Sequence, residues 1–442
     1  MRQHVLGGIC LSIGLLAASP SAARTDAVLR WNENAGRAAT AACLNPDGNA
    51  LAEARMYAMV QIAVHDAVNA IRRQSRSYAY EVQAPGGTSS SAAVAAAARD
   101  VLVAVIGGQL QESAECIQRG LATVEADYAA ALGELPDNTP KARGIAVGQA
   151  AARAILALRA NDGSDTPLVD PGYPQGMLPG EYKFSPGIPF AFAPRWGEVT
   201  PFVLSSSSQF RAGPPFPVAS GDYADDFNEV KSLGGDGVTT PSARTAEQTE
   251  IALFWVESSP LAWNRIARQI SARANLDLNA NARLFGLLNM ALADGYIGSW
   301  EGKYHYNFWR PVTAIQEADT DGNPNTSADP NWTPLHFTYP MPDHDSAHSV
   351  EGGAAAEVLK RFFGTDRIRF RNCSMTLPAG QTCTDARPTR RSFRSFTEAA
   401  NENGLSRILV GIHFRRAVEE GIEHGRNIGR RAVERFMRPV DD

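Results

Sequence analysis

The chain has 442 residues, of which 44% are hydrophobic and 20% are charged, a composition typical of a folded protein with two domains or one large helical one. Its formal net charge is −5, so the overall charge does not favour binding to nucleic acid or to an anionic membrane surface. Any anion-binding site must therefore be a local cluster of basic residues.

The N-terminal segment resembles a secretory signal peptide. Arg2 precedes a short apolar stretch, and the small residues Ser21 and Ala23 stand where a cleavage site requires small side chains. We therefore assign residues 1–23 to a signal peptide and expect a secreted or periplasmic protein. No later stretch has the uninterrupted apolar length of a membrane span, so the mature protein is expected to be soluble.

Four cysteines remain when the signal peptide, with Cys10, is removed, and an even number in an exported chain favours disulfides. Cys373 and Cys383 close a short loop whose Pro and Gly suit a surface excursion. The preferred pairing is therefore Cys373 with Cys383 and Cys43 with Cys116. A zinc site is the alternative, and the cysteines lack the paired C-x2-C spacing that would favour it.

Helical spacing of apolar residues dominates the remainder of the chain. An N-terminal helical bundle is predicted over residues 24–160, from patterns at 50–71, 91–106, 116–132 and 141–160. His65 and Asp66 lie in the first of these, on an Ala- and Val-rich helix. There the favoured reading is a buried histidine with satisfied hydrogen bonds rather than a catalytic one.

Residues 161–242 are rich in Pro, Gly, Ser and aromatic residues, which predicts an irregular but structured connector. A C-terminal helical bundle is predicted over residues 243–442, from patterns at 243–258, 260–276, 279–300, 347–363 and 395–437. No run of alternating strand residues with hairpin turns is present. The predicted fold class is therefore all-α, with two packed helical bundles joined by the long connector.

The segment KYHYNFWRP places Lys303 and Arg310 seven residues apart. On one helix this spacing puts both side chains on the same face, about 10 Å apart, and Pro311 disfavours continuation of that helix. The aromatic residues around the two cations bury the segment, and buried cations require an anionic or hydrogen-bonding partner. The pair is a candidate anion-binding site, and a solvated helical face is the simpler reading.

Two later segments supply the other candidates. In DHDSAHSVEGG, Ser346 and His348 stand at the start of a predicted helix, where free backbone amides attract anions. The simpler reading of this pair is a helix cap and a surface histidine. In GLSRILVGIHF, Arg407 and His413 are six residues apart. A helix break near Gly411 is required to bring both to one site, and otherwise His413 is a core histidine.

Three cations, a serine hydroxyl and two imidazoles together suit a bound tetrahedral or trigonal-bipyramidal oxyanion. The ordered motifs K-x6-R-P, S-x-H and S-R-x5-H resemble those of the superfamily of vanadium-dependent haloperoxidases and type 2 phosphatidic acid phosphatases. Stretches such as ARMYAMVQIAVHDAVNAI and FAPRWGEVTPF look like those of the bacterial secreted, vanadium chloroperoxidase-like branch.

The resemblance implies a role for each candidate in one pocket of the C-terminal bundle. His413 would ligate vanadium or attack phosphorus, His348 would transfer protons, and Lys303 would also polarise bound peroxide. The residues that would bind the oxyanion are Lys303, Arg310, Ser346, Ala347 and Arg407.

Some positions depart from the pattern of the superfamily. Asp345 and Ala347 stand in place of the usual proline and glycine, which puts a carboxylate and a methyl group near the expected anion. Ala417 stands in place of an aspartate that usually supports the ligating histidine. The sequence leaves three carboxylates as substitutes for that aspartate, namely Asp343, Asp345 and Glu420.

The expected function is that of an exported vanadate-dependent haloperoxidase-like enzyme that oxidises halide with hydrogen peroxide. The alternative is an acid phosphatase that hydrolyses a phosphate ester through a phospho-His413 intermediate and needs no cofactor. A third reading is a non-catalytic exported protein that only binds phosphate or an extracellular partner, which would have no use for two placed histidines. The expected partners are small molecules rather than nucleic acid, and the sequence is compatible with a homo-oligomer. Met341, in place of an aromatic residue, leaves the halide preference open.

Overall fold

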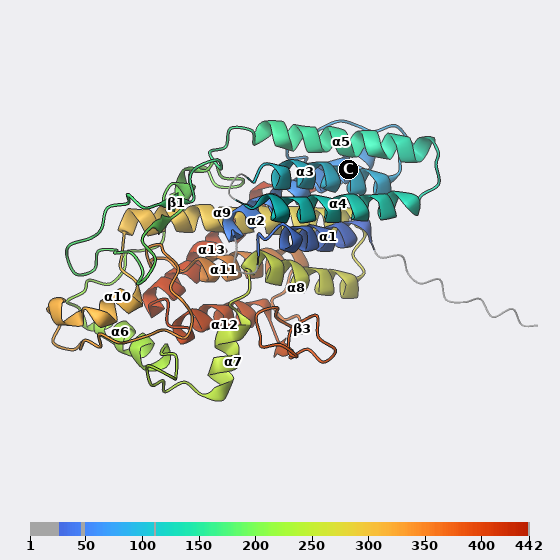
Figure 1. Cartoon of the computed structure of the whole chain (residues 1–442). Helices are drawn as coiled ribbons and strands as arrows, with labels where there is room; N and C mark the ends of the chain where they lie inside the picture. The colour runs from blue at the N-terminus through green and yellow to red at the C-terminus, as the bar shows by residue number, and fades with distance from the viewer. Residues whose placement is uncertain (1–25, 46–48, 110–111, 441–442) are drawn as a thin grey trace, which may run out of the picture.

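The computed structural model describes residues 26–45, 49–109 and 112–440. The predicted signal peptide and Cys10 lie outside these described residues. Within them the chain forms thirteen α-helices, and its four strands have only two or three residues each. The all-α fold class is therefore confirmed, as Figure 1 shows.

The N-terminal helices confirm the four predicted segments and add one helix before them. These helices are α1 (Ala27–Ala41), α2 (Ala50–Ile71), α3 (Ser90–Gly107), α4 (Ala114–Gly133) and α5 (Thr139–Leu158). Each begins at an Asp, Asn or Ser whose side chain accepts a hydrogen bond from a backbone N–H of the first turn. The additional helix α1 buries two polar side chains, Asn32 and Asn34, which interrupt its apolar pattern.

The connector is largely irregular, but it contains a helix that the sequence analysis did not predict. Its elements are β1 (Val169–Asp170), β2 (Ala191–Phe192), the 3₁₀-helix η1 (Trp196–Glu198) and α6 (Gly221–Leu233). Strands β1 and β2 form an antiparallel pair.

The C-terminal part confirms the predicted helices and divides the long pattern at 395–437 into two. The elements are α7 (Ala246–Phe254), α8 (Ser259–Ala274), α9 (Leu278–Tyr306), α10 (Pro311–Gln316), η2 (Ala318–Thr320), α11 (Ala347–Phe363), β3 (Phe370–Asn372), β4 (Arg391–Phe393), α12 (Phe396–Leu409) and α13 (Arg415–Arg435). Strands β3 and β4 pair as an antiparallel hairpin.

Helices α2 and α9 lie side by side between the other helices (Figure 1). Helix α3 packs on α2, while α11 and α13 pack on α9 and on each other. The α11–α13 contact is close because Gly425 has no side chain: a Cβ there would lie 1.9 Å from the carbonyl oxygen of Val350. One cluster of buried apolar side chains runs from α1 through α2 and α9 to α11.

Among the described residues, one helix, α3, is long and apolar enough to cross a membrane by length and composition alone. No such segment was expected from the sequence. In this fold most of α3 is buried, and it packs against α2, α4 and α5 as a core helix does.

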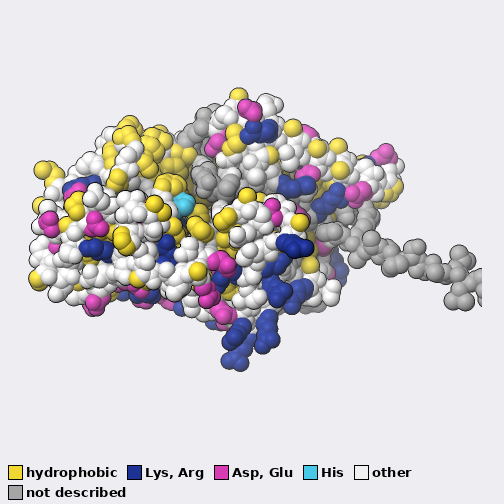
Figure 2. Space-filling model, turned by 60° about the horizontal axis from the view of Figure 1, so that its bottom comes forward, with side chains coloured by type: hydrophobic (Ala, Val, Ile, Leu, Met, Phe, Trp, Pro, Cys, Tyr) yellow, Lys and Arg dark blue, Asp and Glu magenta, His cyan; other side chains and the backbone are white. Residues whose placement is uncertain are grey.

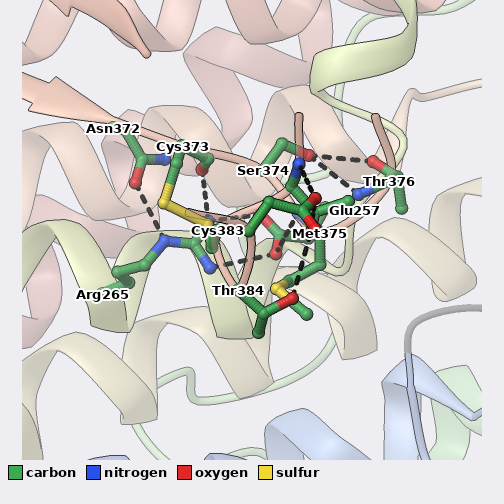
Figure 3. Close-up of a disulfide and its surroundings, with 11 residues drawn as sticks. Glu257, Arg265, Asn372, Cys373, Ser374, Met375, Thr376, Cys383 and Thr384 are labelled. Atoms are coloured by element: carbon green, nitrogen blue, oxygen red, sulfur yellow. Dashed lines mark hydrogen bonds and ion pairs between the residues drawn. A yellow bond between two sulfur atoms is a disulfide. The ribbon is translucent and has the colours of Figure 1, made fainter. Parts of the chain in front are cut away.

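Both predicted disulfides are confirmed, Cys43–Cys116 between the end of α1 and α4 and Cys373–Cys383 in the loop between β3 and β4. Figure 3 shows the second of these, with Arg265 donating hydrogen bonds to Asn372 Oδ1 (2.9 Å) and to the carbonyl of Cys373 (2.7 Å). All four cysteines are therefore used in disulfides, which removes them as zinc ligands.

The reading of His65 as a structural residue is also confirmed. Its side chain is 2% exposed, with Nδ1 2.8 Å from Asp66 Oδ1 and Nε2 2.7 Å from Ser75 Oγ. Both ring nitrogens are thus satisfied within the core.

Candidate active site

Lys303 and Arg310 reach one cavity by a different route from the one predicted. Helix α9 carries Lys303 in its last turn and ends at Tyr306, after which Asn307 adopts the left-handed conformation with φ 48°. Arg310 is the N-cap of α10, where Pro311 is the first residue. The expectation that both cations share one helical face is therefore wrong, because the chain turns between them, yet both side chains line the same cavity.

The predicted helix break between Arg407 and His413 is confirmed. Helix α12 ends at Leu409, and α13 begins at Arg415. Gly411, between the two helices, has φ +83°, and a Cβ there would lie 2.5 Å from the carbonyl oxygen of Gly234. A side chain would be both strained and crowded at this position, so glycine permits the turn that aims both functional groups at the cavity.

A cavity of about 80 Å³ collects the five candidate cations and imidazoles, which are Lys303, Arg310, His348, Arg407 and His413. A single water needs roughly 10–15 Å³ of such space, so the cavity has room for several waters or for one small oxyanion. Ala347, at the start of α11, also lines it. The candidate residues on this wall all come from the C-terminal half, as predicted, and Ala50 and Leu51 of α2 and Phe192 of β2 complete the wall from outside it.

Ser346 is the one predicted residue that does not line this cavity. It is fully buried as the N-cap of α11, its hydroxyl accepts a hydrogen bond from Ser349 Oγ (2.9 Å), and its N–H donates to the carbonyl of Ala417 (3.0 Å). These contacts fix the start of the helix and so position the backbone of Ala347.

The cations are held by backbone carbonyls. Lys303 Nζ donates to the carbonyls of Pro342 (3.2 Å), Asp343 (2.9 Å) and Asp345, which occupies all three donors of the ammonium group. Arg310 Nε donates to the carbonyl of Met341 (2.6 Å). In this arrangement Lys303 contributes charge to the cavity rather than a free N–H.

Arg407 has one buried N–H group without a hydrogen-bond acceptor among the described residues. Its Nη1 donates to the carbonyl of Trp255 (3.1 Å), whereas its buried Nε has no hydrogen-bond partner in the described part of the chain. A buried guanidinium N–H without an acceptor is costly, and an oxyanion in the cavity would supply one.

His413 has its lone pair on Nε2. Arg310 Nη1 lies 3.1 Å from Nε2, and because a guanidinium can only donate, Nε2 must accept. The proton is therefore on Nδ1, which donates to Asp343 Oδ1 at 2.7 Å. Burial, followed by the charges of Arg310 and Lys303, lowers the pKa of His413 well below its usual value, so the ring is neutral.

Asp343 is the substitute for the aspartate that is missing at Ala417. Of the three carboxylates that the sequence left open, only Asp343 hydrogen-bonds to His413. Glu420 instead accepts from the backbone N–H of Gly213 (2.7 Å). The carboxylate that was expected beside His413 is thus provided from a different element of the fold.

The carboxylate of Asp345 is directed away from the expected anion. It accepts hydrogen bonds from Ser299 Oγ (2.6 Å) and His424 Nδ1 (2.7 Å), and it does not line the cavity. Burial alone would raise its pKa, but pairing with His424 outweighs this effect and lowers the pKa to about 2. The carboxylate predicted near the anion is therefore ionised, but it is not part of the cavity wall.

His348 is held by the segment before α8. Its Nε2–H donates to the carbonyl of Glu257 at 3.3 Å, which leaves Nδ1 as the basic nitrogen. Burial and the charge of Arg407 lower its pKa well below the usual value, so this ring is also neutral. A neutral imidazole beside the cavity can accept a proton.

The cavity becomes less positive as the pH rises through neutrality. Burial lowers the pKa of Lys303 to about 7 and raises that of Asp343 to about 7. Lys303 loses its charge and Asp343 gains one as the pH increases, so both changes weaken anion binding. We expect affinity for sulfate, whose charge is constant in this range, to fall roughly tenfold per unit above about pH 7. Calorimetric titration from about pH 6 to about pH 8 measures it.

A Lys303→Met variant is the control for this pH dependence. It should bind sulfate more weakly at low pH and show a smaller decrease on raising the pH. Affinity that is constant or increases with pH in the native protein would contradict the assignment.

The comparisons with known proteins agree with this geometry. A family model described as the VCPO second helical-bundle domain matches residues 283–442. Vanadium chloroperoxidase of Curvularia inaequalis is 28% identical over 306 residues, which are 56% of this chain and 48% of that protein. The chain thus spans about half the length of this curated relative.

Two solved structures share the fold over nearly the whole chain. A structure reported as the first bacterial vanadium-dependent iodoperoxidase has a TM-score of 0.75 at 24% identity and covers 95% of this chain and 98% of its own. A holo-type bacterial vanadium-dependent chloroperoxidase has a TM-score of 0.69 at 18% identity, with coverages of 92% and 96%. The resemblance to the vanadium haloperoxidases is therefore confirmed in sequence and in fold.

Proposed function

We propose that this chain, which resembles the vanadium haloperoxidases in sequence and in fold, is an enzyme that holds vanadate in the cavity and oxidises halide with hydrogen peroxide. The observation that carries this proposal is a neutral His413 that carries its lone pair on Nε2, on the wall of a cavity that is also lined by three buried cations. The names of its relatives support the haloperoxidase reading over the phosphatase alternative.

The residues that are present fit a bound vanadate. His413 Nε2 would be the ligand, the free Nε–H of Arg407 would donate to an oxygen, and the backbone of Ala347 at the start of α11 would add an N–H. Lys303 and Arg310 would balance the negative charge. When bound, vanadate supplies a Lewis acid that activates peroxide without changing its own oxidation state.

The protein's own groups would manage protons and water. His348 Nδ1 would accept a proton from incoming peroxide and return one to the product side. Buried aromatic and apolar walls, including Tyr296 and Trp300, limit the number of waters around the cations and so strengthen their electrostatic effect.

Vanadate binding tests this proposal directly. Protein purified without vanadate should bind one orthovanadate per chain by ⁵¹V NMR or calorimetry, and phosphate should compete with it. An Arg407→Gln variant should lose most of this affinity. Binding of vanadate with equal affinity to native protein and to this variant would contradict the assignment of the cavity.

Asp343 is expected to position His413. An Asp343→Asn variant should bind vanadate roughly 10- to 100-fold more weakly, because the amide no longer fixes the Nδ1–H tautomer of the ring. Calorimetry measures this affinity without any turnover. Glu420→Gln is the matched control, since Glu420 does not contact His413, and its affinity should stay close to that of native protein. Unchanged affinity in Asp343→Asn would show that the Asp343–His413 hydrogen bond is not needed.

We further propose that the protein is exported and that residues 1–23 are removed. Two disulfides in the described part of the chain suit an oxidising compartment. Mass spectrometry of exported protein should find its N-terminus after Ala23, and retention of Arg2 would contradict this proposal. Halide preference is not specified by these contacts, although Met341 lies in the cavity wall.

A further inference from the structure

A second concentration of positive charge lies on the β3–β4 hairpin and the end of α8, which are not among the elements that line the catalytic cavity. A groove of about 940 Å³ is lined there by five exposed arginines, which are Arg273, Arg369, Arg371, Arg390 and Arg394. Figure 2 shows Lys and Arg side chains gathered toward the lower edge of the face in view. This local charge contrasts with the net charge of −5 of the whole chain.

These arginines differ from many other surface arginines in having no carboxylate partner. None of the five forms an ion pair within the described residues, whereas Arg37 pairs with Asp127 at 2.5 Å and Arg415 with Glu229 at 2.6 Å. The one acidic residue on the groove wall, Glu398, accepts a hydrogen bond from the backbone N–H of Arg394 rather than from its side chain. The guanidinium groups therefore repel one another, and an anionic ligand would relieve this repulsion.

The groove is built on a braced scaffold. Strands β3 and β4 pair directly, and the Cys373–Cys383 disulfide closes the loop between them (Figure 3). Arg371 Nε donates to Ser392 Oγ on the opposite strand (3.2 Å), and Arg273 Nη1 donates to the carbonyl of Arg369 (3.0 Å). The positions of the cations are thus partly fixed before any ligand binds, which lowers the entropic cost of binding.

We propose that this groove binds an acidic polysaccharide through its carboxylate groups. Guanidinium groups bind carboxylates in a bidentate manner, and several of them along a groove match a chain that repeats its charge. Ser392 and Gln269, which lie among the arginines, can hydrogen-bond to sugar hydroxyls.

The surroundings disfavour two other polyanions. Phe370 and Phe393 on the wall are only 3% and 2% exposed, so the groove offers no aromatic surface on which nucleobases could stack. None of the large hydrophobic side chains that are exposed in the described part of the chain lies on this wall, so none is available here to insert into a membrane. A hollowed, polar and strongly basic surface suits a thin, hydrophilic, charged chain.

Binding to immobilised polyuronate (alginate), measured by interferometry at about 50 mM salt, tests the proposal. The test variant is Arg369→Gln/Arg390→Gln/Arg394→Gln, whose three side chains form no hydrogen bond within the described residues. The matched control is Arg153→Gln/Arg430→Gln/Arg435→Gln, which removes the same charge from exposed arginines elsewhere.

Native protein should bind alginate and not neutral dextran, and added salt should weaken this binding. The groove variant should bind at least about tenfold more weakly, and the control within about twofold of native protein. Equal weakening in both variants would overturn the proposal. So would tighter binding to duplex DNA, poly-glutamate or anionic phosphatidylglycerol vesicles than to alginate. Because the measurement involves no turnover, its result is independent of the proposed enzymatic activity.

Discussion

Replacing His413 with alanine is expected to lower kcat for halide oxidation by about 10³-fold or more, because no other side chain can supply the nitrogen that Nε2 provides. The only other imidazole on the cavity wall, His348, has its Nε2 committed to the carbonyl of Glu257 within the described structure. Steady-state kinetics of peroxide-dependent bromide oxidation at saturating vanadate measures the loss.

The fold should survive this substitution. Arg310 Nη1 lies 3.9 Å from Asp343 Oδ1. The buried carboxyl group of Asp343 therefore still has a cationic partner when the His413 ring is removed. We therefore expect little change in thermal midpoint. His305→Ala is the matched control, because His305 is exposed and contacts only the surface Arg211 among the hydrogen bonds of the described residues. Native activity in His413→Ala would remove this residue from the mechanism.

Replacing His348 with alanine should separate proton transfer from anion binding. We expect kcat to fall roughly 10²- to 10⁴-fold, because the general base is lost while the cations and His413 remain. Vanadate affinity measured by calorimetry should stay near that of native protein, since a neutral His348 adds no charge to the cavity. A parallel loss of affinity and kcat would indicate that His348 holds the anion instead.

The sequence predicted which side chains would line one cavity more reliably than it predicted the backbone turns that bring them there. The break at Gly411 followed from helix geometry, because six residues rotate a helix by about 600° and leave Arg407 and His413 unaligned. The turn after Tyr306 was missed, because the spacing of Lys303 and Arg310 also fits one continuous helix. Asn307 in the left-handed conformation ends that helix, and asparagine is only one of several residues that can do so.

The partner of His413 depended on tertiary structure. Asp343 lies 70 residues before His413, in a loop that precedes α11, and nothing local in the sequence distinguishes it from Asp345. Their opposite roles arise from His424 on α13, which draws Asp345 away from the cavity. Similarly, the contribution of Ala50 and Leu51 to the cavity wall follows from the packing of α2 against α9, which periodicity does not encode.

The sequence of helix α6 contains a helical pattern of apolar residues that the composition of the surrounding connector made hard to recognise. Tyr223, Phe227 and Val230 recur at helical spacing and are buried, and Ser220 caps the helix. The Pro- and Gly-rich residues around this short segment favoured an irregular interpretation of the whole connector.

Vanadate titration of protein purified without vanadate tests the central claim most directly, because the two enzymatic readings of this cavity predict opposite results. A haloperoxidase requires vanadate, so stoichiometric addition should start peroxide-dependent bromide or chloride oxidation, and phosphate should suppress it by competition. A phosphatase is inhibited by vanadate, which mimics the pentacoordinate transition state of phosphoryl transfer. We predict activation of halide oxidation. Absence of halide oxidation at every acidic and neutral pH, together with vanadate inhibition of phosphate-ester hydrolysis, would contradict the account.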